Sequence, residues 1–278
     1  MDKETKLPAY SVAMSVYAGE KPEFLRQSLE SMLTQTHPCT ELLLVCDGRL
    51  TDGLDAVIAE YLGKFGGRLS TVRMGKPAGV GACANEALNA ARTEYIVKMD
   101  SDDIADPRRC EVQLRYMSRH PELDMCGAYI EEFDSATGRQ IAIKRTPVKN
   151  HDIHRYARRR NPFNNQTLVY RKSAAKRIGG YGDFRRCEDY EFVVRMLKNG
   201  AIGVNIPRVL VRYRVTEDNL SRRRNLRNTK SFIAVRWRIF RMGYSSLIDF
   251  LVPCAAQIAL FLLPGSLTGW LYGRFLRK

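Results

Sequence analysis

The sequence lacks the cysteine patterns of zinc-binding and disulfide-bonded proteins. Its seven cysteines are scattered, their number is odd, and no two stand in a CxxC pair. This usage is typical of a protein in a reducing cytosol. The first ten residues, MDKETKLPAY, are polar and lead directly into a predicted strand. We therefore expect no secretory signal.

A long uninterrupted apolar run is also missing. Residues 244–273 are mostly apolar, but Asp249, Pro253 and Pro264 interrupt them. The longest charge-free stretch before Pro264 is 250–263, which is shorter than the about 20 residues that a membrane-spanning helix needs. The pattern favours a helix that lies on a membrane over one that crosses it.

Acidic residues are scarce in the second half of the chain. Residues 1–150 contain 19 Lys and Arg against 22 Asp and Glu, whereas residues 151–278 contain 26 against 8. The whole net charge of +15 therefore comes from the second half. Unless it is only a solvated face, such a half indicates an anionic partner: nucleic acid, a membrane surface or a phosphorylated substrate.

Strand and helix patterns alternate along residues 10–133. Short β-rich apolar runs predict strands, and apolar residues three or four apart predict helices. Strands are predicted at 10–16, 41–46, 69–74, 95–99 and 125–133, and helices at 22–33, 55–65, 108–119 and the end of 75–91. Short alternating elements of this kind predict an α/β fold, with a mainly parallel Rossmann-like sheet and helices on both faces.

An acidic cluster ends the fourth predicted strand. In the stretch 96–106, IVKMDSDDIAD, the residues Asp100, Asp102 and Asp103 stand within four positions. Carboxylates this close repel one another. Bound Mg²⁺ or Mn²⁺ would relieve the repulsion, and these ions usually share their oxygen ligands with phosphates. The simpler interpretation is helix capping, which we expect for Asp103 and Asp106.

A glycine-rich loop in 75–91 leads into a predicted helix. Gly79, Gly81 and Ala84 fit the G-x-G-x-x-A pattern, which leaves an NAD(P)-binding oxidoreductase as an alternative. Four residues separate the preceding strand from the first glycine, unlike in that pattern. The more general interpretation is a set of helix N-terminal amides that face an anion. With Asp47 at the end of the second strand, the loop and the acidic cluster would line a nucleotide-diphosphate site.

A second candidate site lies in the basic half. Residues 179–182 form a glycine-rich turn, and CEDYE at 187–191 opens a helix predicted to reach residue 197. Acids in a first helical turn are favoured by the helix dipole, so Glu188 and Asp189 need have no further role. The alternative is a carboxylate general base held on a rigid helix end. A last strand is predicted at 206–214.

These blocks, in this order, resemble family-2 glycosyltransferases of the GT-A fold over residues 9–215. The resemblance rests on SVAMSVYAGEKPEFLRQSLESMLTQT, LLLVCDGRLTD, GVGACANEALNAARTEYIVKMDSDD and CEDYEFVVRM, which include a DxD motif and an ED motif. The blocks NPFNNQTLVYRKSAAKRIGGYGDF and VLVRYRV are similar to those of bacterial O-antigen and exopolysaccharide transferases.

The resemblance implies three groups of site residues. Asp189 would be the catalytic base, and the acceptor would be contacted by Glu188, Gly180 and Tyr181. Asp102, with Asp100, would bind Mn²⁺ or Mg²⁺. The nucleotide-sugar donor would be contacted by Tyr17, Glu20, Asp47, Gly79, Gly81, Asn85, Asp100 and Ser101, with Tyr17, Glu20 and Asp47 around the base and Asp100 at the ribose.

The implied reaction is an inverting, metal-dependent hexose transfer. Glucose or galactose would move from a UDP-sugar to a lipid-diphosphate-linked sugar such as GlcNAc-diphospho-undecaprenol, and a β-linkage would form. The resemblance places this reaction in O-antigen or exopolysaccharide synthesis, beside other polysaccharide-assembly enzymes. A basic nucleic-acid-binding protein remains the alternative, although we expect no nucleic acid as partner.

The chain is predicted to divide at residue 215. Residues 1–215 would form the GT-A domain, with a donor half at about 1–134 and an acceptor half at about 135–215, and 216–278 would form a basic, apolar helical tail. We expect the tail to attach the enzyme, as a peripheral or monotopic protein, to the cytoplasmic leaflet of the bacterial inner membrane. A full span over 247–271 and a buried helical hairpin are the alternatives.

Overall fold

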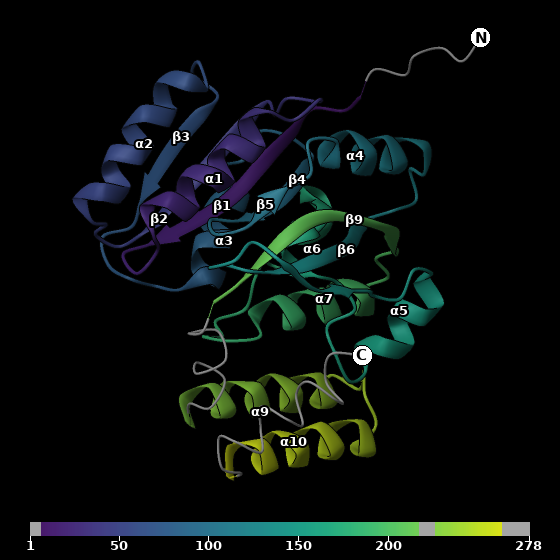
Figure 1. Cartoon of the computed structure of the whole chain (residues 1–278). Helices are drawn as coiled ribbons and strands as arrows, with labels where there is room; N and C mark the ends of the chain where they lie inside the picture. Colours follow the sequence, from purple (N-terminus) through teal and green to yellow (C-terminus); the bar gives the residue numbers. More distant parts are fainter. Residues whose placement is uncertain (1–6, 217–225, 263–278) are drawn as a thin grey trace.

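A curved mixed sheet, flanked by helices and underlain by a two-helix layer, forms the molecule (Figure 1). The computed structural model describes residues 7–216 and 226–262. The strand order is β3-β2-β1-β4-β8-β6-β9-β5, and β7 pairs with β6 outside this path.

The first four strands of this order are parallel, as predicted. Their neighbours pair in parallel register, and helices connect them as crossovers. The strands are β1 (Tyr10–Tyr17), β2 (Glu41–Asp47), β3 (Leu69–Arg73) and β4 (Tyr95–Asp100), and the helices are α1 (Pro22–Leu33), α2 (Asp52–Lys64) and α3 (Val80–Ala90).

Beyond β4 the sheet is mixed, so the predicted parallel character belongs to its first part. The strand pairs β4–β8, β8–β6, β5–β9 and β6–β7 are antiparallel, whereas β6 and β9 are parallel. The hairpin that joins β6 to β7 accounts for the antiparallel pairing of these two strands. These strands are β5 (Ile104–Ala105), β6 (Met125–Asp134), β7 (Gln140–Lys144), β8 (Val169–Arg171) and β9 (Gly203–Val215).

Helices cover both faces of the sheet, as the sequence predicts. Strand side chains alternate between the two faces, so Leu42 and Leu44 join one buried cluster and Leu43 and Val45 the other. The first cluster lies under α1, α2 and α4 (Arg109–Arg119). The second lies under α3, α5 (Asn150–Ala157), α6 (Lys172–Arg177) and α7 (Glu188–Lys198).

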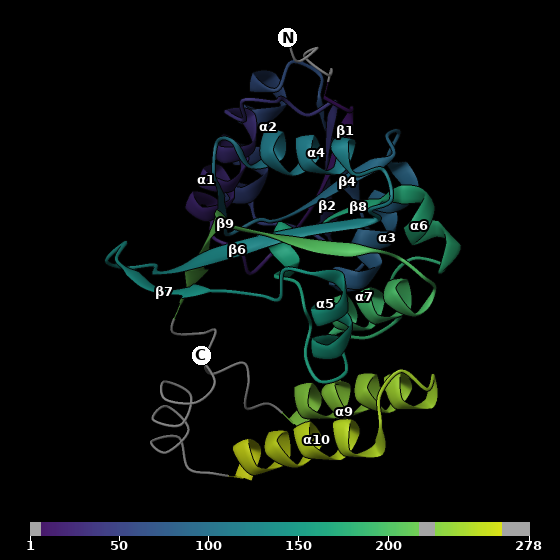
Figure 2. The ribbon, with the colours of Figure 1, turned by 90° about the vertical axis from the view of Figure 1, so that its right-hand side faces the viewer.

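Two C-terminal helices, α9 (Leu226–Arg241) and α10 (Leu247–Leu262), pack as a layer beneath α5 and α7 (Figure 2). Val235 and Ile239 of α9 belong to the second cluster, so the layer shares a core with the sheet. No helix among the described residues is long and apolar enough to cross a membrane. The rest of the predicted span, at 263–271, lies outside the described residues.

Candidate active site

The ends of three neighbouring strands bring the first predicted site residues together. In the parallel register, Tyr17 at the end of β1 lies opposite Asp47 at the end of β2. Ser15 of β1 lies opposite Asp100, the last residue of β4. All three strands therefore deliver polar side chains to one edge of the sheet, where open α/β folds bind ligands.

Asp100 and Asp102 form a crowded acidic centre at this edge. Burial, together with the charges of Asp100 and Glu20, raises the pKa of Asp102 to about 7. Burial likewise raises the pKa of Asp100, against the opposing charge of the buried Lys98. Glu20 is held nearby, since the Ser101 hydroxyl donates a hydrogen bond of 3.1 Å to its carboxylate. The positive charges of Lys98, Arg109 and Arg214 offset these effects only in part.

Asp103 does not cap a helix, contrary to the sequence prediction. Its side chain is fully buried, and its Oδ1 accepts a 2.9 Å hydrogen bond from the backbone N–H of Arg214 on β9. Arg214 Nε in turn donates to the carbonyl oxygen of Asp102 at 2.7 Å. Asp103 therefore fastens the acidic loop to β9. Asp106 does accept from the backbone N–H of Arg108, which precedes α4.

The acidic centre suits a divalent cation shared with a ligand. No group of three or more His, Cys, Asp or Glu side chains in the described ranges is placed to hold a metal ion alone. Mg²⁺ and Mn²⁺ are commonly held by one or two carboxylates together with phosphate oxygens and water. Asp100 and Asp102 supply such oxygens, and a cation there would offset the repulsion that raises the pKa of Asp102.

Asp47 organises the glycine-rich loop. Its Oδ1 accepts a 2.7 Å hydrogen bond from the backbone N–H of Ala78, and its Oδ2 accepts one of 3.1 Å from Gly79. Gly79 has φ of +92°, a conformation that strains other residues, and α3 begins at the next position. A cavity of about 590 Å³ lies beside this loop, lined by Val72, Arg73, Met74, Gly75, Lys76, Ala78 and Glu86.

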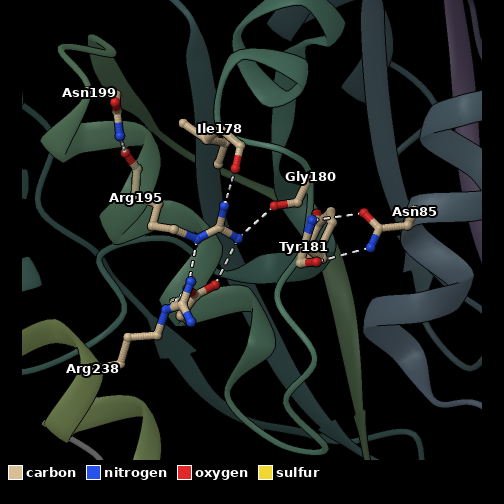
Figure 3. Close-up of polar contacts among 8 residues, drawn as sticks. Asn85, Ile178, Gly180, Tyr181, Arg195, Asn199 and Arg238 are labelled. Atoms are coloured by element: carbon tan, nitrogen blue, oxygen red, sulfur yellow. Dashed lines mark hydrogen bonds and ion pairs between the residues drawn. The ribbon is translucent and has the colours of Figure 1, made fainter. Parts of the chain in front are cut away.

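The side chain of Asn85 on α3 is hydrogen-bonded to the backbone of Tyr181. Its amide donates a 2.9 Å hydrogen bond to the carbonyl oxygen of Tyr181 and accepts one of 2.8 Å from the Tyr181 N–H (Figure 3). Gly180 has φ of +74°, and a Cβ there would lie 2.4 Å from the Asn85 Oδ1. The predicted donor contact of Asn85 therefore competes with a structural role, the joining of α3 to the 179–182 turn.

The Tyr181 ring is largely buried, so little of its side chain is accessible to an acceptor. It is 6% exposed and stacks on Phe192 of α7, with the ring centroids 4.0 Å apart. Gly180 and Tyr181 thus shape the turn.

A buried ion pair joins the same turn to α7. Arg195 donates to both carboxylate oxygens of Glu191, to the carbonyl of Ile178 at 2.5 Å and to that of Gly180 at 2.6 Å (Figure 3). Arg238 of α9 pairs with Glu191 at 2.7 Å. The prediction from sequence omitted this network. The i, i+4 spacing of Glu191 and Arg195 on a buried helix face was its only local signal.

The N-terminus of α7 presents the second pair of acids. Cys187 precedes them with φ of +62°, alone in this respect among the described non-glycine residues. Such strain is common at functional sites. Burial and the charge of Asp189 raise the pKa of Glu188 to about 8. Asp189 Oδ2 accepts a 2.8 Å hydrogen bond from Asn161, a partner that no sequence pattern indicates.

The two groups of acids face a common space. The charge of Asp189 contributes to the raised pKa of Asp100, and that of Lys98 acts on both Asp100 and Glu188. A Cβ on Gly81, in the first turn of α3, would lie 3.3 Å from the Gly182 carbonyl and 3.4 Å from Glu188 Cγ. The N-termini of α3 and α7 therefore adjoin, and the acidic centre lies within electrostatic reach of Asp189.

Known proteins similar to this chain are glycosyltransferases. The model of glycosyl transferase family 2 matches residues 11–179. An uncharacterized glycosyltransferase of Haemophilus influenzae is 36% identical over 273 residues, 97% of this chain and 99% of the relative. An Escherichia coli UDP-Gal:alpha-D-GlcNAc-diphosphoundecaprenol beta-1,3-galactosyltransferase is 31% identical over 271 residues, 98% of both chains.

Two solved structures have the same fold. The S. aureus TarS fragment 1-349 in complex with UDP-GlcNAc has a TM-score of 0.66 at 19% identity, and the match covers 95% of this chain and 79% of that one. The mannosyltransferase PcManGT of Pyrobaculum calidifontis, in complex with GDP-Man and Mn²⁺, has a TM-score of 0.66 at 16% identity, with 95% and 72% covered. These likenesses agree with the predicted GT-A fold.

Proposed function

Since the chain belongs to glycosyl transferase family 2 and is a glycosyltransferase, we propose that it moves a hexose from a UDP-sugar to a lipid-diphosphate-linked sugar with inversion. The observation that carries this proposal is the placement of Asp189 at the N-terminus of α7, within electrostatic reach of the acidic centre. A general base then faces the place where the donor diphosphate would bind.

The donor and acceptor are supported by the similar proteins. The E. coli relative, which matches over nearly the full length of both chains, is named for a UDP-galactose donor and a GlcNAc-diphosphoundecaprenol acceptor. The TarS structure carries UDP-GlcNAc. Galactose on GlcNAc-diphospho-undecaprenol, with glucose as the second sugar, is therefore the first combination to try. An O-antigen or exopolysaccharide would be the product.

Mn²⁺ or Mg²⁺ would be held by Asp102 and Asp100. When bound, such an ion neutralises the charge that develops on a departing diphosphate. The amides of Ala78 and Gly79 already donate to Asp47, so the backbone N–H groups in the first turn of α3, from Val80 on, would face the same anion. Tyr17 and Glu20, at and just beyond the end of β1, would flank the base.

Asp189 would act as the general base toward the acceptor. Its carboxylate would take the proton of the acceptor hydroxyl as that oxygen attacks the anomeric carbon from the face opposite the diphosphate. A single displacement of this kind inverts the configuration, so an α-linked donor gives a β-glycoside. Asn161 holds one carboxylate oxygen and leaves the other for the proton. Glu188, with its pKa at about 8, keeps its proton at neutral pH and would donate a hydrogen bond to the acceptor.

Membrane attachment would be supplied by the C-terminal helices. Exposed apolar side chains form one face of α10: Leu247, Ile248, Leu251, Val252 and Ile258. Basic residues of α9 accompany them, and the proposed acceptor is itself a membrane lipid. We place the enzyme peripherally on the cytoplasmic leaflet of the inner membrane, with 1–215 as the catalytic domain and 216–278 as the attaching tail.

The two alternative functions lose their basis. Family membership replaces the oxidoreductase interpretation of Gly79 and Gly81. The nucleic-acid interpretation rested on charge alone, which a lipid surface with a diphosphate-linked acceptor explains as well.

The substitution Asp189→Asn tests the proposal. Loss of a general base should lower kcat by about 10²–10⁴-fold and leave UDP affinity unchanged. The assay is transfer from a panel of radiolabelled nucleotide sugars to synthetic GlcNAc-diphospho-lipid, with and without Mn²⁺. Asp52→Asn, which alters an exposed acid in the first turn of α2, is the matched control. Near-normal turnover by Asp189→Asn, or no transfer from any donor by the unaltered enzyme, would contradict the proposal.

A further inference from the structure

A basic cavity lies on the side of the molecule that the proposed reaction does not use. It has a volume of about 420 Å³ and lies between α5 and the turn that joins α9 to α10. Its lining residues are His151, His154, Arg155, Arg158, Gly243 and Tyr244. None of these described lining residues is acidic, so the cavity is suited to an anion.

Contacts between α5 and the turn that joins α9 to α10 form one wall of this cavity. The Tyr244 hydroxyl and His154 Nδ1 are 3.1 Å apart, and their rings stack. The backbone N–H of Tyr244 donates to the Ile239 carbonyl at 3.2 Å, which holds the turn against the end of α9. Arg158 lies close enough to Tyr244 to lower the pKa of the phenol, which burial raises to about 12. The cavity therefore lies at the junction of α5 with the α9–α10 helix pair.

Carboxylates near the cavity are already occupied. Asp249 of α10 pairs with Arg159 at 2.5 Å and accepts from the Ser246 hydroxyl at 2.8 Å. Asp152 lies 3.1 Å from His151 at the rim. Within the described ranges, no ion pair joins Arg155 or Arg158 to a carboxylate, so these two guanidinium groups are left to attract an external anion.

The cavity adjoins the exposed apolar face of α10. Tyr244 precedes Leu247 by three residues, and Leu247 and Ile248 are 54% and 64% exposed. Leu251 and Val252, one turn further, are 50% and 53% exposed. A basic cavity beside an exposed apolar stripe matches the layering of a membrane surface, where phosphates lie next to the acyl chains.

We propose that this cavity binds the phosphate of an anionic phospholipid headgroup while the apolar face of α10 enters the acyl boundary. The proposal rests on the membrane attachment proposed above and adds the site that recognises the lipid. Arg155 and Arg158 would make charge-assisted hydrogen bonds to the phosphate oxygens, and the Tyr244–His154 pair would shape the opposite wall.

The lipid-linked acceptor is a less suitable occupant. Lys198, at the C-terminal end of α7, donates to the Met242 carbonyl beside the cavity, whereas Asp189 lies at the N-terminal end. A helix of this length separates its two ends by about 15 Å. A diphosphate one sugar away from the reacting hydroxyl lies closer to Asp189 than that. The site therefore suits bulk membrane lipid.

A pair of charge-matched double variants tests the proposal with the full chain. Arg155→Gln/Arg158→Gln removes two charges from the cavity, and Lys230→Gln/Arg241→Gln removes two exposed charges from α9, outside it. Flotation with phosphatidylcholine vesicles containing about 30% phosphatidylglycerol measures binding. The cavity variant should partition about ten-fold more weakly than the unaltered enzyme, and the α9 variant less than about three-fold. Unchanged melting temperatures check the fold.

Three results would overturn the proposal, and they are distinguishable. Equal losses in the two variants would show diffuse attraction, with membrane attachment intact. If the unaltered enzyme does not bind the vesicles, the proposed membrane attachment is itself wrong. Inorganic phosphate and excess phosphatidylglycerol vesicles, at matched ionic strength, can each be tested as competitors for the bound enzyme. If phosphate displaces the enzyme from the labelled vesicles as completely as the competing vesicles do, the cavity is a site for free phosphate. Transfer to a water-soluble acceptor, measured in parallel, reports the proposed reaction separately.

Discussion

At the scale of single residues, ionisation of the acidic centre lowers the stability of the fold. Asp102 is buried with Asp100 and Glu20 beside it, which raises its pKa to about 7. The ordinary pKa of an aspartate is near 4, so the folded state resists ionisation of this group. Below about pH 4 the group is protonated in both the folded and the unfolded state, so it does not lower the free energy of unfolding. Above about pH 7 it is ionised in both states, and the full cost of ionising it inside the fold is present.

Asp102→Asn should therefore stabilise the metal-free protein at high pH. The gain should be on the order of 1–3 kcal/mol in the free energy of unfolding at pH 8 and vanish at pH 4. Urea unfolding in EDTA at the two pH values measures it, with Asp52→Asn as the exposed control. Activity should be lost, because the variant lacks the proposed metal ligand. An equal gain at both pH values would show that ionisation is not its source.

At the scale of elements, the 179–182 turn joins α3 to α7, the helices that carry proposed donor and acceptor residues. Asn85 ties it to α3 through two hydrogen bonds, and Arg195 ties it to α7 through the carbonyls of Ile178 and Gly180. Arg238 extends the link from Glu191 to α9. Because each bond is buried or half-buried, the loss of one partner leaves polar groups of the turn unsatisfied.

Asn85→Ala distinguishes a positioning residue from a donor contact. If Asn85 only holds the turn, kcat should fall about 10-fold or more and stability by about 1–3 kcal/mol, with the KM for the nucleotide sugar unchanged. Asn89→Ala, one turn further along α3 at an exposed position, is the matched control. A rise in donor KM without loss of stability would favour the contact that the sequence alone suggests.

At the scale of the whole molecule, charge and apolar surface are segregated. The first half carries slightly more acid than base, and the second half holds the whole excess of 26 basic over 8 acidic residues. The α9–α10 layer lies below α5 and α7, so its outer surface is remote from the parallel strands (Figure 2). The proposed nucleotide and cation site therefore lies at one end of the molecule, and the proposed membrane-binding surface lies at the other.

Ile248→Glu/Leu251→Glu should detach the enzyme from membranes. Two charges on the face of α10 oppose its insertion, so the fraction that sediments with inner membranes should fall several-fold, while turnover of a water-soluble acceptor persists. Ile141→Glu/Ile143→Glu, on the exposed strand β7, provides a control of equal number and type. Sedimentation unchanged relative to this control would show that another surface carries the attachment.

The sequence by itself determined the features that depend on local pattern. Apolar periodicity located the first four strands and their helices, because each element buries a face set by residues close in the chain. The order of motifs identified the family, and the count of charges located the basic half.

Only the tertiary structure decided the contacts between distant segments. Asp103 meets Arg214 from 111 positions away, and Asn85 meets Tyr181 from 96. The first pairing makes the predicted cap a buried anchor, and the second gives Asn85 a structural role beside its predicted donor contact. No local pattern encodes them, because a hydrogen bond across the fold depends on where the chain returns and on which groups burial leaves without water.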